Sequence, residues 1–92
     1  MTPPSLMPRI SEFFGISIHM YWRDHLPPHF HAVYAEAEAA ITIEHLSVLH
    51  GSLSPRVLGL VIEWATLHRE ELTDRWQRAQ RLLPLGRVDP LQ

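Results

Sequence analysis

Three of the seven histidines in this 92-residue chain lie within seven positions, at His25, His29 and His31. Two prolines, Pro27 and Pro28, separate the first histidine from the other two. Proline fixes its own φ and favours extended geometry in the residue before it, so this pair stiffens the approach to His29. Ligand-binding and catalytic groups require such rigid placement. The segment is therefore the strongest candidate for a functional site.

Two strands are predicted on either side of the two prolines. Residues 16–23 and residues 29–35 each alternate apolar and polar side chains with a period of two, which is typical of half-buried strands. The prolines between them cannot extend a central strand and predict a loop. We therefore expect an antiparallel hairpin. In it, Arg23 lies opposite His29, Tyr21 opposite His31 and His19 opposite Val33.

A third strand over residues 39–44 is predicted to complete the site. It follows a hairpin turn at residues 35–38 and pairs Tyr34 with Ala39. This register places His31 opposite Thr42 and His29 opposite Glu44. Facing side chains in a sheet have Cβ atoms about 5 Å apart, so groups on the polar face can converge. With His25 at the rim, these groups are His19, Tyr21, Arg23, His29, His31, Thr42 and Glu44.

Metal binding is one use of such a set. His29 and His31 stand on the same side of a strand, and His25 could supply a third ligand to a divalent transition metal such as zinc or nickel. Glu44 could be a fourth ligand, or it could orient a histidine from outside the coordination sphere.

Proton transfer on an RNA phosphodiester is a second use, and it needs no metal. Two histidines, or a histidine and a carboxylate, exchange protons while other groups hold the phosphate. The proton-transferring residues would be His29, His31, Glu44 and His25, and the substrate-binding residues would be Arg23, Tyr21, His19 and Thr42. A third use is recognition without chemistry, by stacking on bases or on a partner's side chains. The plain alternative is the hydrated side of a sheet.

The C-terminal part predicts one long amphipathic helix. Ser54 is a good N-cap and Pro55 suits the first helical position, while apolar residues then recur at steps of three and four up to residue 83. About 28 residues would span roughly 40 Å, which exceeds a compact domain of this size. We therefore expect either a break near residues 72–74 or a protruding end that meets a partner. Trp64 and His68 lie on the apolar stripe and are expected to be packed.

The predicted fold class is α+β, as a single domain. A small antiparallel meander of three to four strands, the last of them short and over residues 47–50, packs on the long C-terminal helix. Residues 1–9 are expected to be a flexible leader, residues 10–53 the sheet region, and residues 54–92 the helix with a short tail. Ninety-two residues leave no room for a second core.

Composition restricts the function classes. A formal net charge of −2 disfavours a bulk electrostatic grip on nucleic acid, although a local basic patch stays open. The chain lacks cysteine, which removes disulfides and thiolate chemistry. No stretch approaches the roughly 20 apolar residues of a membrane span, and the start lacks a signal-peptide pattern. We expect a cytoplasmic protein.

Three segments together resemble a small bacterial family called domain of unknown function 4160. They are residues 10–16 (ISEFFGI), residues 25–32 (HLPPHFHA), and Glu63-Trp64-Ala65 with His68 and Glu71-Leu72. The similarity covers about residues 7–91, and Pro90-Leu91 fits it too. The chain departs from the family where a glycine commonly follows the tyrosine, because Ala35 follows Tyr34 here.

The resemblance implies short cytoplasmic proteins whose genes often stand beside another small family, in pairs that resemble toxin–antitoxin modules. It therefore implies a small cognate protein partner and favours a toxin-like subunit with a histidine-centred site acting on RNA. Asp24-His25 and His29-x-His31 would form that site, with Arg23 and Tyr21 on the phosphate. The alternatives are a non-catalytic binding or regulatory module that docks a partner, a homodimer through the helix, and a histidine metal-binding protein.

Overall fold

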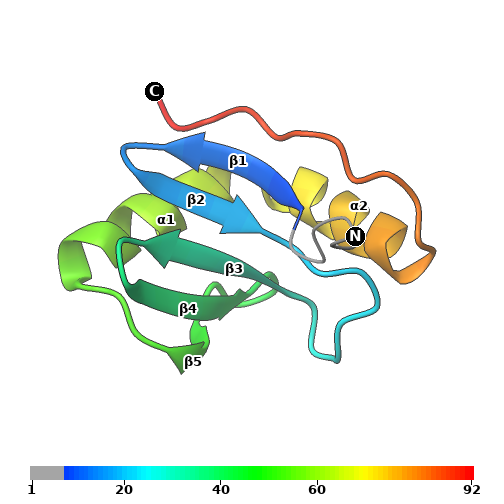
Figure 1. The fold of residues 1–92 in the computed structure, drawn as a ribbon, viewed down its shortest axis with the longest axis horizontal. Helices are drawn as coiled ribbons and strands as arrows, with labels where there is room; N and C mark the ends of the chain where they lie inside the picture. Colours follow the sequence, from blue (N-terminus) through cyan, green and yellow to red (C-terminus); the bar gives the residue numbers. More distant parts are fainter. Residues whose placement is uncertain (1–7) are drawn as a thin grey trace, which may run out of the picture.

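The computed structural model describes residues 8–92, in which five strands precede two helices (Figure 1). The elements are β1 (Arg9–Phe13), β2 (Ile16–His19), β3 (His29–Tyr34), β4 (Ala37–Thr42), β5 (Val48–Gly51), α1 (Pro55–Leu67) and α2 (Arg69–Gln80). Each strand pairs antiparallel with the next along the chain, which makes a meander. The α+β class is confirmed, but the expected three to four strands are wrong because there are five. The expected leader falls largely on residues 1–7, which lie outside the described residues.

The additional strand is β1, and a bulge explains why its sequence does not alternate. The register with β2 shifts between Arg9 and Ser11, so that neighbouring Ile10 and Ser11 are both buried. Phe14 and Gly15 join β1 to β2 with positive φ values of 51° and 78°. Two such residues in a row are typical of a type I′ hairpin turn, where glycine is favoured at no steric cost.

The strand register around the histidines differs from expectation by two residues. His31 pairs with His19 in β2 and with Ala40 in β4, while His29 pairs with Thr42. The turn after β3 is shorter than expected, because Tyr34 pairs with Ala37 across two residues only. A shift of two keeps every side chain on its predicted face, since the pleat repeats every two residues. The hydrophobic pattern therefore could not distinguish the two registers.

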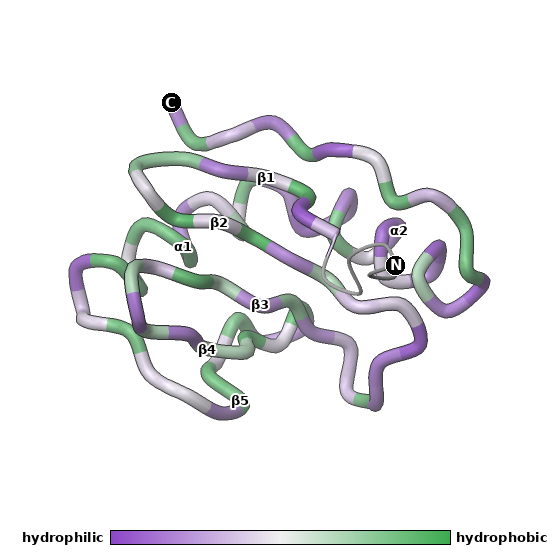
Figure 2. The backbone as a smooth tube through the Cα atoms, in the orientation of Figure 1, coloured by the Kyte–Doolittle hydropathy of each residue, from purple (hydrophilic) through white to green (hydrophobic). Residues whose placement is uncertain are grey.

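Two helices replace the single long helix that was expected. α1 ends at Leu67, and α2 begins at Arg69, with His68 between them at φ −123°. The break thus lies before the predicted residues 72–74. The predicted start is confirmed, because the Ser54 hydroxyl accepts a hydrogen bond from the Val57 backbone N–H at 3.3 Å. In Figure 1 both helices lie behind the sheet, and Figure 2 shows hydrophilic residues along much of α2.

The core lies between the sheet and the helices. Trp64 of α1 is fully buried, and its ring packs against Phe13 and Phe30 at centroid distances of 5.5 and 5.8 Å. The segment after α2 returns along β1 (Figure 1), where the Val88 N–H donates to the Ile10 carbonyl at 2.7 Å. In the described part of the chain, no helix is long and apolar enough to cross a membrane.

Candidate functional site

The three clustered histidines gather around one carboxylate. Asp24 and His25 lie in the loop between β2 and β3, and His29 and His31 are the first and third residues of β3. Asp24, His29 and His31 each offer one ligand atom, and these atoms all lie within 4.8 Å of one another. We call Asp24, His25, His29 and His31 the Asp24 cluster. It forms because β3 turns alternate residues to one face and the loop returns Asp24 onto that face.

The Asp24 carboxylate faces several nitrogen atoms. Its Oδ2 lies 2.9 Å from Nε2 of His29 and 3.2 Å from Nε2 of His31. Its Oδ1 accepts the backbone N–H of His25 at 2.8 Å. The side chains of His29, His31 and Asp24 are only 0%, 5% and 12% exposed. Burial would raise the pKa of Asp24, but the His25 N–H, the His31 hydrogen bond and the nearby histidine charges outweigh it and lower this pKa. Asp24 is therefore ionised at neutral pH.

The ring nitrogens that face away from Asp24 show where the histidine protons lie. Nδ1 of His29 lies 2.7 Å from the Pro27 carbonyl oxygen, and Nδ1 of His25 lies 3.2 Å from that of Leu26. A carbonyl oxygen only accepts, so each of these nitrogens carries a proton. A neutral ring protonated at Nδ1 has its lone pair on Nε2. If the His29 ring is neutral, its Nε2 presents a lone pair to the Asp24 carboxylate, and that contact is favourable only with a cation, either a metal ion or a second ring proton.

Helix α2 holds the loop that carries Asp24. Arg23 has a left-handed φ of 53°, and its N–H donates to the Ala79 carbonyl at 3.2 Å. The Gln80 side-chain amide donates to the Asp24 backbone carbonyl at 3.3 Å. The Trp76 ring lies 5.4 Å from the His29 ring. The C-terminal half of α2 thus forms the support of the site.

Aromatic and histidine rings rim the cluster. The Tyr21 ring lies 4.3 Å from the His31 ring, and the His25 ring stacks on that of His29 at 5.1 Å, with 67% of its side chain exposed. His50 of β5 lies 6.2 Å from His31, ring to ring. Burial, and then the charges of Glu38 and Asp24, raises the pKa of Tyr21, so its phenol keeps its proton at neutral pH.

Not every predicted residue joins this cluster. Glu44 lies beyond the end of β4, its side chain is 84% exposed, and its carboxylate is 3.8 Å from His45. Thr42 takes the expected place of Glu44 opposite His29, but its hydroxyl interacts with that of Ser47 at 3.1 Å.

His19 and Arg23 are close to the cluster in the chain, but their contacts lie elsewhere. His19 is the register partner of His31, and its Nε2 lies 3.0 Å from the Ser17 hydroxyl. Arg23 is exposed and contributes the backbone hydrogen bond to α2 described above. The cluster therefore unites His25, His29 and His31 of the predicted set, with Tyr21 beside them.

Glu38 of β4 is a carboxylate neighbour of the cluster that the sequence did not predict. Its Oε2 lies 3.5 Å from Nδ1 of His31. It pairs with Val33, two residues along from the Ala40 that faces His31, so it is a diagonal neighbour of His31 on the same face. A two-residue turn after Tyr34 would have revealed this register, but the expected turn included Glu38.

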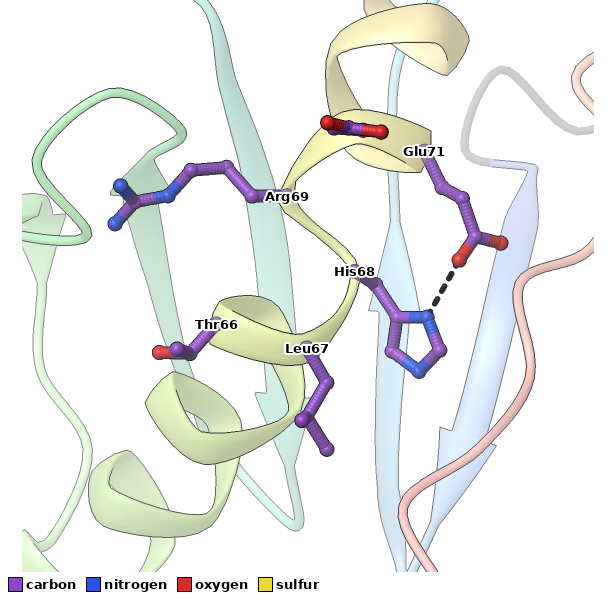
Figure 3. Close-up of a pocket in the computed structure, with 6 residues that line it drawn as sticks. Thr66, Leu67, His68, Arg69 and Glu71 are labelled. Carbon is purple, nitrogen blue, oxygen red and sulfur yellow. Dashed lines mark hydrogen bonds and ion pairs between the residues drawn. The ribbon is translucent and has the colours of Figure 1, made fainter.

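A second histidine–carboxylate pair lies where α1 meets α2. Nδ1 of His68 lies 2.7 Å from Oε1 of Glu71, and the His68 ring packs 5.5 Å from the Trp64 ring. Figure 3 shows this pair in a groove at the helix break, with Arg69 and Thr66 directed away from it. As expected, His68 is a packed and hydrogen-bonded residue, with 15% of its side chain exposed.

Comparison with known proteins places the chain in one family. No curated protein and no solved structure matches it. A family model described as a domain of unknown function (DUF4160) matches residues 15–77. The match spans strands β2–β5, the whole Asp24 cluster, α1 and most of α2, and it covers more than half of the chain. The chain therefore belongs to the DUF4160 family.

Proposed function

We propose that the Asp24 cluster binds one divalent transition metal ion, zinc or nickel, through Oδ2 of Asp24 and Nε2 of His29 and His31. The observation that supports this most is the convergence of both Nε2 atoms on one carboxylate oxygen, while Nδ1 of His29 is held by a carbonyl. A hydrogen bond from Nδ1 to a carbonyl or carboxylate is the usual outer-sphere feature of a metal-bound histidine.

The donors and their two separations from the Asp24 carboxylate fit such an ion. Imidazole nitrogen and carboxylate oxygen bind zinc at about 2.0–2.2 Å, so neighbouring ligand atoms in a tetrahedral site lie roughly 3.3 Å apart. The separations from Oδ2 of Asp24 are 2.9 and 3.2 Å, within a few tenths of an ångström of that value. His25 could supply a fourth ligand, since its Nε2 lies 3.6 Å from Oδ1 of Asp24.

A proton is the alternative cation. If His29 were doubly protonated, it would donate to the Pro27 carbonyl and to Asp24, and the cluster would be a buried ion pair without metal. Calorimetric titration of metal-stripped protein with Zn²⁺ and with Ni²⁺ separates these cases. We expect one ion per chain, confirmed by elemental analysis after dialysis. Folded wild-type protein that binds neither ion at micromolar concentration would show that the cation is a proton.

Substitutions locate the ion. The double variant His29→Gln with His31→Gln is expected to lose binding, because both nitrogen ligands are replaced. A matched double variant, His45→Gln with His68→Gln, removes two histidines outside the cluster and is expected to bind as the wild type does. Circular dichroism checks that both variants fold. Equal zinc binding by the two double variants would exclude the Asp24 cluster as the site.

A second candidate is action on RNA as a toxin-like subunit in the cytoplasm, paired with a small cognate protein. The rim of the cluster favours it, because Tyr21 packs against His31 and His25 is exposed, and such rings can stack on bases. Since the His29 side chain is fully buried, contact with RNA would depend on these rim residues.

Expression in a bacterial host, with and without the gene next to its own, tests the second candidate. We expect growth arrest and altered RNA profiles that the neighbouring product relieves, and we expect Tyr21→Ala with His25→Ala to abolish the arrest. If the folded His29 and His31 double variant remained toxic, the histidine site would not be responsible. A harmless chain that binds the neighbour's product would instead be a docking module.

A further inference from the structure

We infer that Glu38 is the positioning residue of this metal site: it accepts the Nδ1–H of His31 and thereby fixes Nε2 of His31 as the ligand atom. The inference rests on the proposed metal binding and adds a residue that neither the family match nor the sequence pattern assigns.

The first observation is an unpaired buried nitrogen. Among the described residues, Nδ1 of His31 is buried and has no hydrogen-bond partner. Oε2 of Glu38 lies 3.5 Å from it, just beyond hydrogen-bonding geometry. Buried polar atoms in folded proteins nearly always have a partner. A movement of a few tenths of an ångström by the Glu38 side chain, which is 44% exposed, would supply one.

Contacts with β5 fix the backbone around Glu38. The Ser52 N–H donates to the Glu38 carbonyl at 3.1 Å, where β5 closes against β4. Gly51 adopts a φ of +81°, and a Cβ there would lie 2.3 Å from the same carbonyl oxygen. Only glycine fits this approach of β5 to the backbone of Glu38. The neighbouring Ala40, opposite His31, is small and leaves the carboxylate room to reach the ring.

The three histidines of the cluster then follow one rule. Nδ1 of His25 faces the Leu26 carbonyl, Nδ1 of His29 faces the Pro27 carbonyl, and Nδ1 of His31 faces the Glu38 carboxylate. In each ring the opposite nitrogen, Nε2, faces Asp24. Two of these acceptors are neutral backbone carbonyls, whereas the Glu38 acceptor is a charged side chain. It therefore increases the basicity of its histidine, and substitution can remove it without altering the loop.

Zinc affinity of Glu38 variants tests this role. Outer-sphere partners of metal-bound histidines typically contribute about 10–100-fold to metal affinity, so we expect a loss of that size in Glu38→Ala. Glu38→Gln retains an acceptor oxygen and should lose less. The matched control is Glu36→Gln, which removes the same charge from the exposed turn two residues away and should bind zinc within about twofold of the wild type.

Nitrogen-15 NMR of the zinc-loaded protein provides a readout that a merely structural role would not alter. We expect His31 to be zinc-bound at Nε2 and protonated at Nδ1 in the wild type, and to lose that single state in Glu38→Ala. If the wild type binds zinc and Glu38→Ala binds it equally well, the inference fails while the metal site stands. If Glu38→Ala and Glu38→Gln lose affinity equally and His31 keeps its state, Glu38 acts by charge alone and the inference is overturned. If the wild type binds neither zinc nor nickel, the proposed function itself fails.

Discussion

Within residues 8–92, a histidine ring, a carboxylate and a tryptophan meet in two places. At the helix break, His68 contacts Glu71 at 2.7 Å and packs on Trp64. In the Asp24 cluster, His29 contacts Asp24 at 2.9 Å and packs on Trp76. The ring distances, 5.5 and 5.4 Å, are nearly equal. The two places therefore combine the same three kinds of side chain at nearly the same distances.

The difference lies in how many groups share each carboxylate. Glu71 faces one ring nitrogen and is 45% exposed, so a single proton on Nδ1 of His68 and surrounding water satisfy the pair. Asp24 faces three histidines and is 12% exposed. The Nδ1 atoms on the far side of those rings already face acceptors. One proton per ring cannot satisfy such a set. Convergence and burial, rather than the presence of histidine and carboxylate, distinguish the proposed ligand site from a structural contact.

The largest expected effect comes from removing the shared carboxylate. Asp24→Asn keeps the shape of the side chain but removes the anionic ligand, so zinc binding should fall on the order of a hundredfold or more, beyond the usual effect of an outer-sphere partner. Glu71→Gln makes the same chemical change in the other pair and should leave zinc affinity unchanged. Competition with a chromogenic chelator measures both. Equal losses would remove the distinction between the two places.

The two tryptophans should separate stability from binding. Trp64 is fully buried against Phe13 and Phe30, so Trp64→Ala should destabilise the fold by about 3–5 kcal/mol, as measured by urea unfolding. Trp76→Phe keeps most of the packing but replaces the indole ring that contacts the His29 ring. It should therefore weaken zinc binding while changing the free energy of unfolding little. A Trp76→Phe variant with unchanged zinc affinity would show that the Trp76 ring does not support the site.

A smaller effect is expected at the helix break. His68→Gln removes the ring that joins the end of α1 to the first turn of α2, and the loss of one partly exposed contact should cost about 1 kcal/mol of unfolding free energy. Glu63→Gln, an exposed change on α1, is the control and should change stability by less than half of that. If His68→Gln alone reduced zinc affinity tenfold, the two places would be coupled.

The smallest expected effect is the pH dependence of stability in the metal-free protein. Burial lowers the pKa of His31 below its usual 6.5, and the charge of His29 lowers it further. The hydrogen bond to Asp24 and the charge of Asp24 raise this pKa but do not outweigh the burial. The unfolded chain then takes up that proton at a higher pH than the folded chain. The stability contribution of neutral His31 is complete above about pH 6.5 and is lost as the pH falls from there through the folded pKa.

Urea unfolding at pH 7.5, 6.5 and 5.5 measures this window. We expect the wild type to lose stability across it and His31→Gln to lose less. The lowered pKa of Asp24 acts in a separate window below its ordinary 3.8, where its protonation removes stability as the pH falls. Parallel decline of wild type and His31→Gln would show that other histidines control the acid response.

The sequence by itself determined which side chains share a face. Period-two alternation placed His29 and His31 together and away from Phe30, and the Ser54-Pro55 pair located the start of α1. These features depend on nearest neighbours along the chain, where the pleat and the helix cap impose strict local rules. The predicted approach of Tyr21 to His31 also agrees with the structure, although the two are not register partners.

The sequence had already placed Asp24 with these histidines, but only the tertiary structure decided which glutamate meets them and how Asp24 reaches them. A two-residue register shift leaves every face unchanged, so alternation could not choose between Glu44, which lies outside, and Glu38, which lies beside His31. The place of Asp24 depends on a loop held by Ala79 and Gln80, more than 50 residues away in the chain. Strand register and loop position result from long-range hydrogen bonds and packing, and no local pattern records them.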